Sequence, residues 1–162
     1  MTSAPAADAA AVVSAASDAG LTVATAESLT AGMVAAELGA VPGVSAVLAG
    51  AVVAYSNFVK KKVLGVDADL LASAGSVDAR VAGQMAEGVR RLLETDLGVS
   101  TTGAAGPEPH DGKAVGCVFI AVASPQGTLV EEYSFSGDRA AIRRQACDEA
   151  LVLLGRVLAE HP

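Results

Sequence analysis

The stretch LTVATAESLTAGMVAAELG, residues 21–39, decides the fold class of this chain. Its first part, LTVATA at 21–26, predicts a short strand, and its last part predicts a helix that ends near Gly39. Between them stands a polar group that includes an acid, Glu27, and a serine, Ser28. A strand that leads into a helix is the repeating unit of α/β folds, so we expect that class.

Strands and helices also alternate along the rest of the chain. The 46–56 segment is apolar on both faces, which predicts a strand covered by helices on both sides. Asp78 and Asp138 are the expected N-caps of two long helices, and Gly20 is the expected C-terminal stop of the first helix. The expected helices span 4–20, 57–66, 67–73, 76–96 and 138–160, and the other expected strands span 97–103, 114–124 and 127–137. We therefore predict one α/β domain over residues 1–162, a three-layer α/β/α sandwich with a mixed sheet.

The composition limits the classes of function. Eleven Lys and Arg against eighteen Asp and Glu give a net charge of −7, which disfavours general binding to nucleic acid or to an anionic membrane. Hydrophobic residues make up 52% of the chain and aromatic residues only 3%, so we expect a core built from Ala, Val and Leu. Cys117 and Cys147 fit neither a disulfide framework nor a metal site, and they predict buried free thiols.

The distribution of charge indicates a cellular location. The first positive residue is Lys60, so the N-terminus lacks the basic region of a secretory signal. The uncharged run 38–54 is interrupted at Pro42, which predicts a loop and a strand rather than a membrane span. We expect a cytoplasmic protein.

Ser28 allows two interpretations. A serine between a strand and a helix often caps the helix, and the residue type alone favours that role. The same place suits a nucleophile, since strand ends in such sheets bind ligands and a helix N-terminus presents N–H groups to an oxyanion or phosphate. Glu27 by itself is more typical of a solvated or locally paired acid than of a catalyst.

A second candidate group lies in AYSNFVKKK, residues 54–62. A lysine with a lowered pKa can act as the base for a serine where no histidine is available, and Lys60 lies five residues beyond Tyr55. Three lysines on a short helix are also typical of a solvated face. At most one of them can point into a cleft shared with Tyr55.

Two further stretches could bind a ligand. STTGAAGPEPHDGKAVG, residues 100–116, places glycines after a strand, where the backbone can approach a ligand, but it lacks the spacing of a Walker A loop. His110 has no partner at metal-ligand spacing. In SGDRAAIRRQA, residues 136–146, Arg139 stands in the first turn of a helix against the helix dipole, and Arg143 follows one turn later. An arginine in that place suits a phosphate or a carboxylate.

Taken in order, these stretches resemble the CinA C-terminal domain family, whose enzymes hydrolyse nicotinamide mononucleotide to nicotinic acid mononucleotide and ammonia. The resemblance covers about residues 6–158, and it rests on an ordered set of motifs that are each weak alone. The family pattern runs AES-C-TGG, a Pro-Gly loop, TYSN with a lysine and LGV, G-A-V-S, GIAGP, V-G and F-x-GDR-x-x-V-R-x-Q-A. The corresponding stretches here are 26–32, 41–44, 54–66, 75–78, 103–107, 115–116 and 135–146.

The resemblance implies roles for individual residues. Ser28 matches the nucleophile, and Tyr55 and Lys60 match the residues that assist it by removing, relaying or orienting its proton. Backbone N–H groups near 29–32 would stabilise the oxyanion. Thr102 and Arg139 match positions assigned to the active site or to substrate binding. The other residues that we expect to bind the substrate are Glu27, Thr30, Gly32, Asn57, Gly103, Gly106 and Arg143.

The resemblance also implies the ligand and the partners. The ligand is a pyridine mononucleotide, and the reaction requires no cofactor and no metal. We expect no direct contact with nucleic acid or a membrane, and we expect a homo-oligomer of two or more copies.

The chain departs from the family pattern at three places. Leu29 replaces the usual Cys, Ala31 replaces the first Gly of TGG, and the loop after Pro107 reads EPHDGK instead of a run of glycines. These departures keep one alternative open, a catalytically weak member that binds nucleotides or partners. The family name suggests a second alternative, an interaction protein associated with competence or DNA damage.

Overall fold

The sheet has five strands in the order β2-β1-β3-β4-β5. The computed structural model describes residues 8–161. β1, β2 and β3 run parallel, and β4 and β5 form an antiparallel hairpin beside β3. The strands are β1 Val23–Glu27, β2 Leu48–Val53, β3 Leu97–Gly103, β4 Cys117–Ser124 and β5 Gly127–Ser134. The mixed sheet is confirmed, and β3 spans the residues predicted for it.

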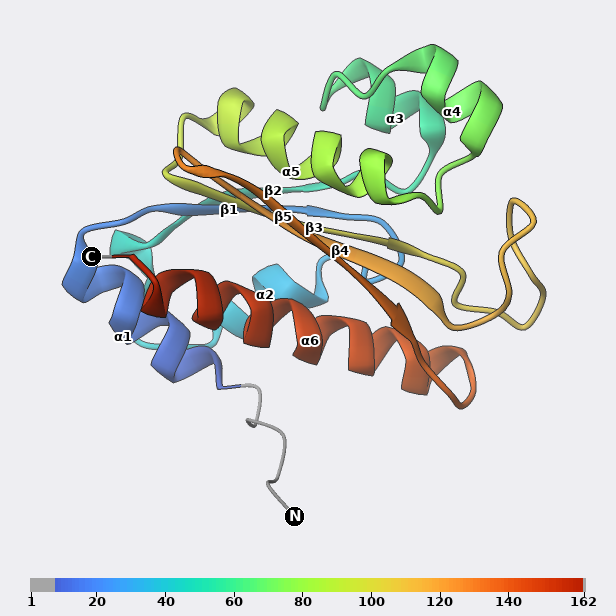
Figure 1. Ribbon diagram of the computed structural model, residues 1–162. Helices are drawn as coiled ribbons and strands as arrows, with labels where there is room; N and C mark the ends of the chain where they lie inside the picture. Colours follow the sequence, from blue (N-terminus) through green and yellow to red (C-terminus); the bar gives the residue numbers. More distant parts are fainter. Residues whose placement is uncertain (1–7, 162) are drawn as a thin grey trace.

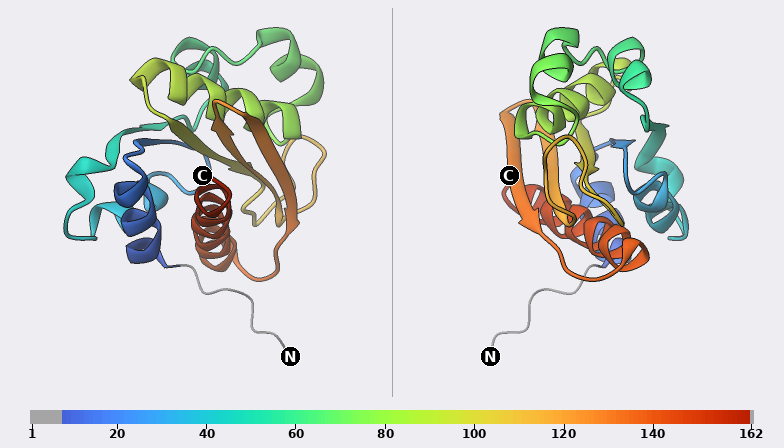
Figure 2. Two further views of the ribbon diagram at one scale, coloured as in Figure 1. Left: turned by 60° about the vertical axis from the view of Figure 1, so that its left-hand side comes forward. Right: turned by 90° about the vertical axis from the view of Figure 1, so that its right-hand side faces the viewer.

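Helices cover both faces of this sheet (Figure 1). α5 packs on β3 and β4 from one side, with α3 and α4 near it, and α6 packs on the same strands from the other side, with α1 and α2 beside it (Figures 1 and 2). The helices are α1 Ala9–Ala19, α2 Met33–Gly39, α3 Asn57–Lys62, α4 Ala68–Ala74, α5 Ala79–Leu93 and α6 Arg139–Ala159, with a short 3₁₀ turn η1 Val44–Ala46. The three-layer α/β/α sandwich is therefore confirmed.

Each face of the sheet has its own apolar core. On the α6 side, Val99 and Ile120 of the sheet pack with Leu154 of α6. The α5 side is lined by smaller residues, and a Cβ at Gly88 of α5 would overlap the carbonyl of Leu64. Glycine there lets the segment after α3 pack directly on α5, which fixes the position of α3 beside the sheet.

The predicted helix ends are mostly confirmed. Asp78 and Asp138 cap α5 and α6, because their carboxylates accept hydrogen bonds from N–H groups of the first turn. Gly20 ends α1 in the left-handed region with a φ of 68°. α1 begins at Ala9, so the described helix is shorter than predicted, and the expected start at residue 4 lies outside the described residues.

The expectation that helices cover both faces of the strand at 46–56 is wrong. β2 is an edge strand, and its alternate residues Ala49, Ala51 and Val53 are exposed. The run has no charge, but its small Ala, Gly and Val side chains tolerate a half-exposed edge. An uncharged run of small residues therefore does not by itself indicate burial on both faces.

The helix of the opening stretch begins later than the position of Ser28 suggests. α2 starts at Met33, and residues 28–32 form a turn before it. The carboxylate of Glu27 caps this helix, since it accepts from the N–H groups of the second and third residues of α2 at 2.9 and 3.1 Å. The interpretation of Ser28 as the helix cap is therefore wrong.

Candidate active site

The carboxyl ends of the three parallel strands meet at one edge of the sheet. β1 ends one residue before Ser28, β2 ends two residues before Tyr55, and β3 ends at Gly103. A cavity of about 370 Å³ lies there, at the edge where parallel sheets bind ligands. Its lining residues are Ser28, Leu29, Tyr55, Ser56, Asn57, Ser76, Gly103, Ala104, Ala105, Gly106, Glu108, His110, Asp111 and Arg139.

Ser28 lines this cavity and is in direct contact with Lys60, which is not itself part of the lining. Lys60 Nζ donates a hydrogen bond to Ser28 Oγ at 2.9 Å. The same Nζ donates to the backbone carbonyls of Ala54 and Tyr55 at 2.8 and 3.1 Å. Lys60 is 1% exposed and Ser28 is 9% exposed. Three acceptors match the three N–H groups of an ammonium, so the buried charge is fully hydrogen-bonded.

These partners also determine how the neutral amine of Lys60 is oriented. A carbonyl oxygen can only accept, so after loss of one proton the two remaining N–H groups stay on Ala54 and Tyr55. The lone pair is then directed at Ser28 Oγ, which can donate its hydrogen. The geometry therefore aims a base at Ser28.

Burial makes that neutral form accessible. It lowers the pKa of Lys60 from 10.5 to about 8, and the negative charge of Asp111 opposes part of the shift. About one-tenth of the Lys60 side chains are then neutral at pH 7, compared with fewer than about one in a thousand for an ordinary lysine. A lysine in this state can act as a general base near neutral pH.

Of the three lysines, only Lys60 turns inward onto Ser28, which agrees with the prediction that at most one of them can point into the cleft. α3 begins after Ser56, whose hydroxyl accepts from the N–H of the third helical residue at 3.2 Å. Lys60 is buried, whereas Lys61 and Lys62 are exposed. Successive helical residues point about 100° apart, so the register set by the cap selects Lys60.

Tyr55 and Arg139 form a pair at the rim of the cavity. The Arg139 guanidinium donates to the Tyr55 hydroxyl at 2.7 Å and to the carbonyl of Gly106 at 2.7 Å. Both side chains are exposed, and Arg139 is the first residue of α6 as predicted. The contribution of Tyr55 to Lys60 is its backbone carbonyl, while its hydroxyl bonds to Arg139.

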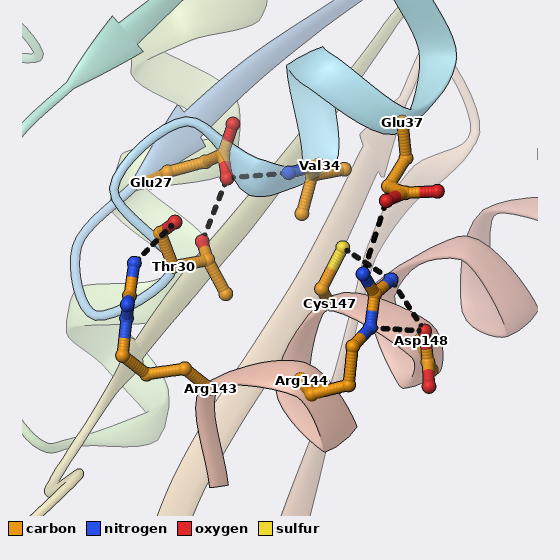
Figure 3. Close-up of polar contacts among 8 residues, drawn as sticks. All are labelled: Glu27, Thr30, Val34, Glu37, Arg143, Arg144, Cys147 and Asp148. Carbon is orange, nitrogen blue, oxygen red and sulfur yellow. Dashed lines mark hydrogen bonds and ion pairs between the residues drawn. The ribbon is translucent and has the colours of Figure 1, made fainter. Parts of the chain in front are cut away.

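Glu27 is the last residue of β1, directly before the turn 28–32, and Figure 3 shows its hydrogen bonds with Thr30 and with the N–H of Val34. It is 1% exposed, and in addition to capping α2 it accepts from the hydroxyls of Thr25 and Thr30 at 3.0 and 2.7 Å. Thr30 also shares a hydrogen bond of 2.8 Å with Thr101 of β3. Glu27 and Thr30 therefore hold the turn 28–32, and neither lines the cavity.

Arg143 and Thr102 likewise support loops that line the cavity. Arg143 of α6 donates to the carbonyls of Leu29 and Thr30 at 2.8 and 3.4 Å, the second of which Figure 3 shows. Thr102 is buried in β3 and donates to the carbonyl of Ser76 at 2.7 Å. Neither side chain is part of the cavity lining.

A second arginine ties α6 to α2 on the same side of the sheet. Arg144 contacts Glu37 at 3.0 Å and Asp148 at 2.6 Å (Figure 3). Beside it, Cys147 is buried, and burial raises the pKa of its thiol to about 12, which keeps it protonated. Both cysteines are free, but Cys117 is only partly buried, so the prediction of buried thiols holds for Cys147 alone.

Of the remaining residues predicted to bind the substrate, three line the cavity and one, Gly32, lies in the turn 28–32. Asn57, Gly103 and Gly106 line the cavity. A Cβ at Gly103 would lie 2.7 Å from a methyl group of Val118, so glycine lets β3 lie close to β4. Gly32 does not line the cavity, and its φ of 100° marks the start of α2.

The backbone groups expected to hold an oxyanion are partly engaged. The N–H of Ala31 donates to the carbonyl of Ser28 at 3.1 Å, which leaves the N–H groups of Leu29, Thr30 and Gly32 as candidate donors. Ala31 has a φ of 48° and its side chain is exposed. A glycine adopts that left-handed conformation more easily, which gives a physical reason for the glycine of the family pattern.

Sequence reasoning missed Ser76 and Asp111. The Asp111 carboxylate accepts from the backbone N–H and the hydroxyl of Ser76 at 2.8 and 2.9 Å. Asp111 and Gly112 stand at the centre of a tight turn closed by two backbone hydrogen bonds between His110 and Lys113. Asp-Gly is typical of such a turn, so the sequence carries a signal for the turn, but none for its contact with a residue 35 positions away.

Two kinds of site find no support in the described part of the chain. Over residues 8–161, no group of three or more His, Cys, Asp and Glu side chains is placed to hold a metal ion. Within the same range, no helix is long and apolar enough to cross a membrane.

Comparison with known proteins identifies the family. The model of the CinA C-terminal domain matches residues 6–158. This chain belongs to the CinA C-terminal domain family. It is similar to a CinA superfamily protein from Klebsiella pneumoniae, with 33% identity, a TM-score of 0.90 and coverage of 93% of this chain and 95% of that one. It is also similar to the competence/damage-inducible protein of Agrobacterium tumefaciens, with 32% identity, a TM-score of 0.89 and coverage of 99% and 100%.

Curated relatives carry the same CinA domain within longer proteins. A putative competence-damage inducible protein of Desulforamulus reducens is 51% identical over 134 residues, which are 83% of this chain and 33% of that protein. A CinA-like protein of Frankia casuarinae is 46% identical over 141 residues, 87% of this chain and 33% of that protein. The chain thus spans about a third of the length of these relatives. The name of the first refers to competence and damage, the name of the second only to CinA, and neither names a reaction.

Proposed function

We propose that this CinA-domain protein hydrolyses the carboxamide of nicotinamide mononucleotide, giving nicotinic acid mononucleotide and ammonia. The observation that carries the proposal is the 2.9 Å contact between Lys60 Nζ and Ser28 Oγ at the cavity. A serine and a buried lysine of lowered pKa form a nucleophile and base pair that needs no histidine. The substrate is the one implied by the family resemblance.

The geometry supports a two-step acyl transfer. Neutral Lys60 takes the proton of Ser28 Oγ, and the oxygen attacks the carboxamide carbon to form a tetrahedral intermediate. The Lys60 ammonium then gives its proton to the departing nitrogen, which leaves as ammonia and an acyl ester on Ser28. Water, activated by the same amine, attacks the ester and releases the carboxylic acid and the serine. The sum is amide plus water to acid plus ammonia, so the atoms balance.

The rim of the cavity supplies groups for the rest of the substrate. Arg139 presents a guanidinium, which suits the phosphate of a mononucleotide. The glycine-rich turn 103–106 exposes backbone near the same point, and the carbonyl of Gly106 holds Arg139 in place. A volume of about 370 Å³ is within the usual range for a small-molecule site.

Two of the three departures from the family pattern, Leu29 and Ala31, leave the hydrogen bond between Ser28 and Lys60 unchanged. Leu29 lines the cavity, but it takes no part in the hydrogen bonds of Ser28 with Lys60. Ala31 points its methyl group to solvent and is not part of the lining. These placements favour an active enzyme over a catalytically weak member of the family.

Ammonia release by the purified protein tests the proposal. Nicotinamide mononucleotide should give equal amounts of ammonia and nicotinic acid mononucleotide, whereas free nicotinamide, which lacks the phosphate for Arg139, should be a poor substrate. Folded protein that releases no ammonia from the mononucleotide would exclude the proposed reaction.

A further inference from the structure

The loop after β3 brings a carboxylate to the cavity at a place where the family pattern has glycines. Asp111 lies at the centre of the tight turn His110–Lys113, with a φ of 50°, and lines the same cavity as Ser28. In Figure 1 this loop, in yellow to orange, projects beyond the end of the sheet.

The loop is fixed to the rest of the site through Asp111. Its Oδ2 accepts from the N–H and the hydroxyl of Ser76 at 2.8 and 2.9 Å. The carbonyl of Ser76 in turn accepts from Thr102 of β3 at 2.7 Å. A Cβ on Gly75 would lie 2.6 Å from the Asp111 Cβ, so glycine at 75 permits the approach. These contacts hold one carboxylate in a defined position on the lining of the cavity that Ser28 also lines.

We propose that Asp111 is a positioning residue of the Ser28 and Lys60 pair, whose fixed negative charge stabilises the ammonium that Lys60 becomes when it takes the proton of Ser28. The role resembles that of an acid that stabilises a protonated base without exchanging a proton itself. It rests on the hydrolysis proposed above, and it adds a residue that governs the pH range in which Lys60 works as a base.

The charges around Lys60 single out Asp111. Lys61 and Lys62 of its own helix are exposed, and Arg139 of α6 engages Tyr55 and Gly106 at the rim. Glu27 of β1 faces α2. The loop carries Glu108, His110 and Asp111, and His110 Nε2 lies 3.3 Å from Asp111 Oδ2. Of these charges, Asp111 is the one that raises the pKa of Lys60, and the hydrogen bonds from Ser76 lower the pKa of Asp111 itself, which keeps it ionised.

Asp111→Asn is the matched variant that removes the charge and keeps the loop. Asn tolerates a left-handed φ and its side-chain oxygen can accept from Ser76. Glu108→Gln is the control, because Glu108 is an acid of the same loop and cavity.

The direct measurement is the titration of Lys60 in the protein without substrate. The chain has only four lysines, Lys60, Lys61, Lys62 and Lys113, so protein labelled with ¹³C at lysine Cε gives four resonances, and loss of one in Lys60→Met assigns Lys60. Asp111→Asn should lower the titration midpoint of Lys60 by roughly half a pH unit or more, while Glu108→Gln leaves it in place. The same midpoint in Asp111→Asn and the unsubstituted protein would overturn the proposal.

Turnover then separates a positioning role from a merely structural one. In Asp111→Asn, the pH dependence of ammonia release should shift to lower pH and the plateau kcat should fall, with KM nearly unchanged. A rise in KM with no shift of the pH profile would contradict the proposal, because it would show that Asp111 only holds the loop. Since the titration needs no turnover, absence of ammonia release would count against the hydrolysis alone.

Discussion

Glu27 and Ser28 are adjacent in the sequence, yet they serve opposite sides of one turn. Glu27 faces the protein interior and is held by Thr25, Thr30 and two N–H groups of α2. Ser28 faces the cavity and is bonded to Lys60. On the interior side, the carboxylate of Glu27 is fully hydrogen-bonded within the protein. On the cavity side, Ser28 is bonded to a candidate base, Lys60, and lines a cavity that can hold a ligand.

Stability and chemistry are separated on the two sides of this turn. Among the described residues, no buried side-chain N or O atom lacks a hydrogen-bond partner, so the interior network has no capacity left for a ligand. On the cavity side, Arg139 is exposed, and the lone pair of neutral Lys60 is aimed at Ser28. Substitutions behind the turn should therefore change stability, and those in front should change turnover.

The largest effect is expected on the cavity side, at Lys60. Lys60→Met should lower turnover by roughly 10²–10⁴-fold, because it removes the general base. In the unsubstituted protein, turnover should rise with pH around a midpoint near 8 and level off about one pH unit higher, since the neutral amine is the active form and burial lowers the pKa of Lys60 to about 8. Ammonia release measured from pH 6 to 10 checks both statements.

Lys61→Met is the matched control for Lys60→Met. Lys61 follows on the same helix and is exposed, so turnover should stay close to that of the unsubstituted protein. An equal loss of turnover in Lys60→Met and Lys61→Met would mean that these lysines act only through their positive charge and that Lys60 is not the base.

The largest stability effect is expected behind the turn, at Glu27. Glu27→Ala should lower the free energy of unfolding by about 3 kcal/mol or more, because several hydrogen bonds to a buried acid are lost and their partners stay buried. Glu37→Ala, which removes a half-exposed ion pair with Arg144, should cost no more than about 1 kcal/mol. Urea unfolding compares the two, and a fully stable Glu27→Ala that has lost turnover would place Glu27 in the chemistry instead.

A moderate effect on binding is expected at the rim. Arg139→Ala should weaken mononucleotide binding by roughly 1.5–3 kcal/mol, the range for a lost charge-assisted hydrogen bond, and Arg139→Lys should recover only part of it. Arg80→Ala is the control, since Arg80 stands in the first turn of α5 and does not line the cavity. Calorimetric titration of the three variants with the mononucleotide measures these differences. Unchanged affinity in Arg139→Ala would show that the phosphate binds at another place.

The smallest effect is expected at Ala31, on the exposed corner of the turn. Ala31→Gly should raise the free energy of unfolding by up to about 1 kcal/mol, because glycine relieves the left-handed φ of 48°. Turnover should change little, since Ala31 is not part of the cavity lining. Gly32→Ala should do the opposite, because Gly32 has a φ of 100°. Thermal melts of both variants test this part of the comparison.

Much of the fold could be predicted from the sequence because its signals are local. Asp78 and Asp138 stand directly before the helices they cap, and Gly20 follows the helix it ends. The edge position of β2 could not be predicted, because it depends on the strand order of the whole sheet.

In the candidate site, too, the sequence could indicate what depends on local signals and could not indicate what depends on packing between distant segments. Lys60 could be singled out as a lysine placed to assist a serine, and the cap of α3 gives the reason that it faces inward. The roles of Glu27 and Arg143 could not be predicted, because they follow from the packing of α2 and α6 around the turn. The contact of Asp111 with Ser76 joins residues 35 positions apart, and no local pattern encodes it.

Turnover by Ser28→Ala decides whether Ser28 is the nucleophile, because Ser28 Oγ would form the new bond to the substrate and Ser28 has no part in capping α2. Ammonia release from nicotinamide mononucleotide should fall by roughly 10³-fold or more. The thermal melt and the affinity for the mononucleotide should stay close to those of the unsubstituted protein. Ammonia release at the original rate by folded Ser28→Ala would contradict the account.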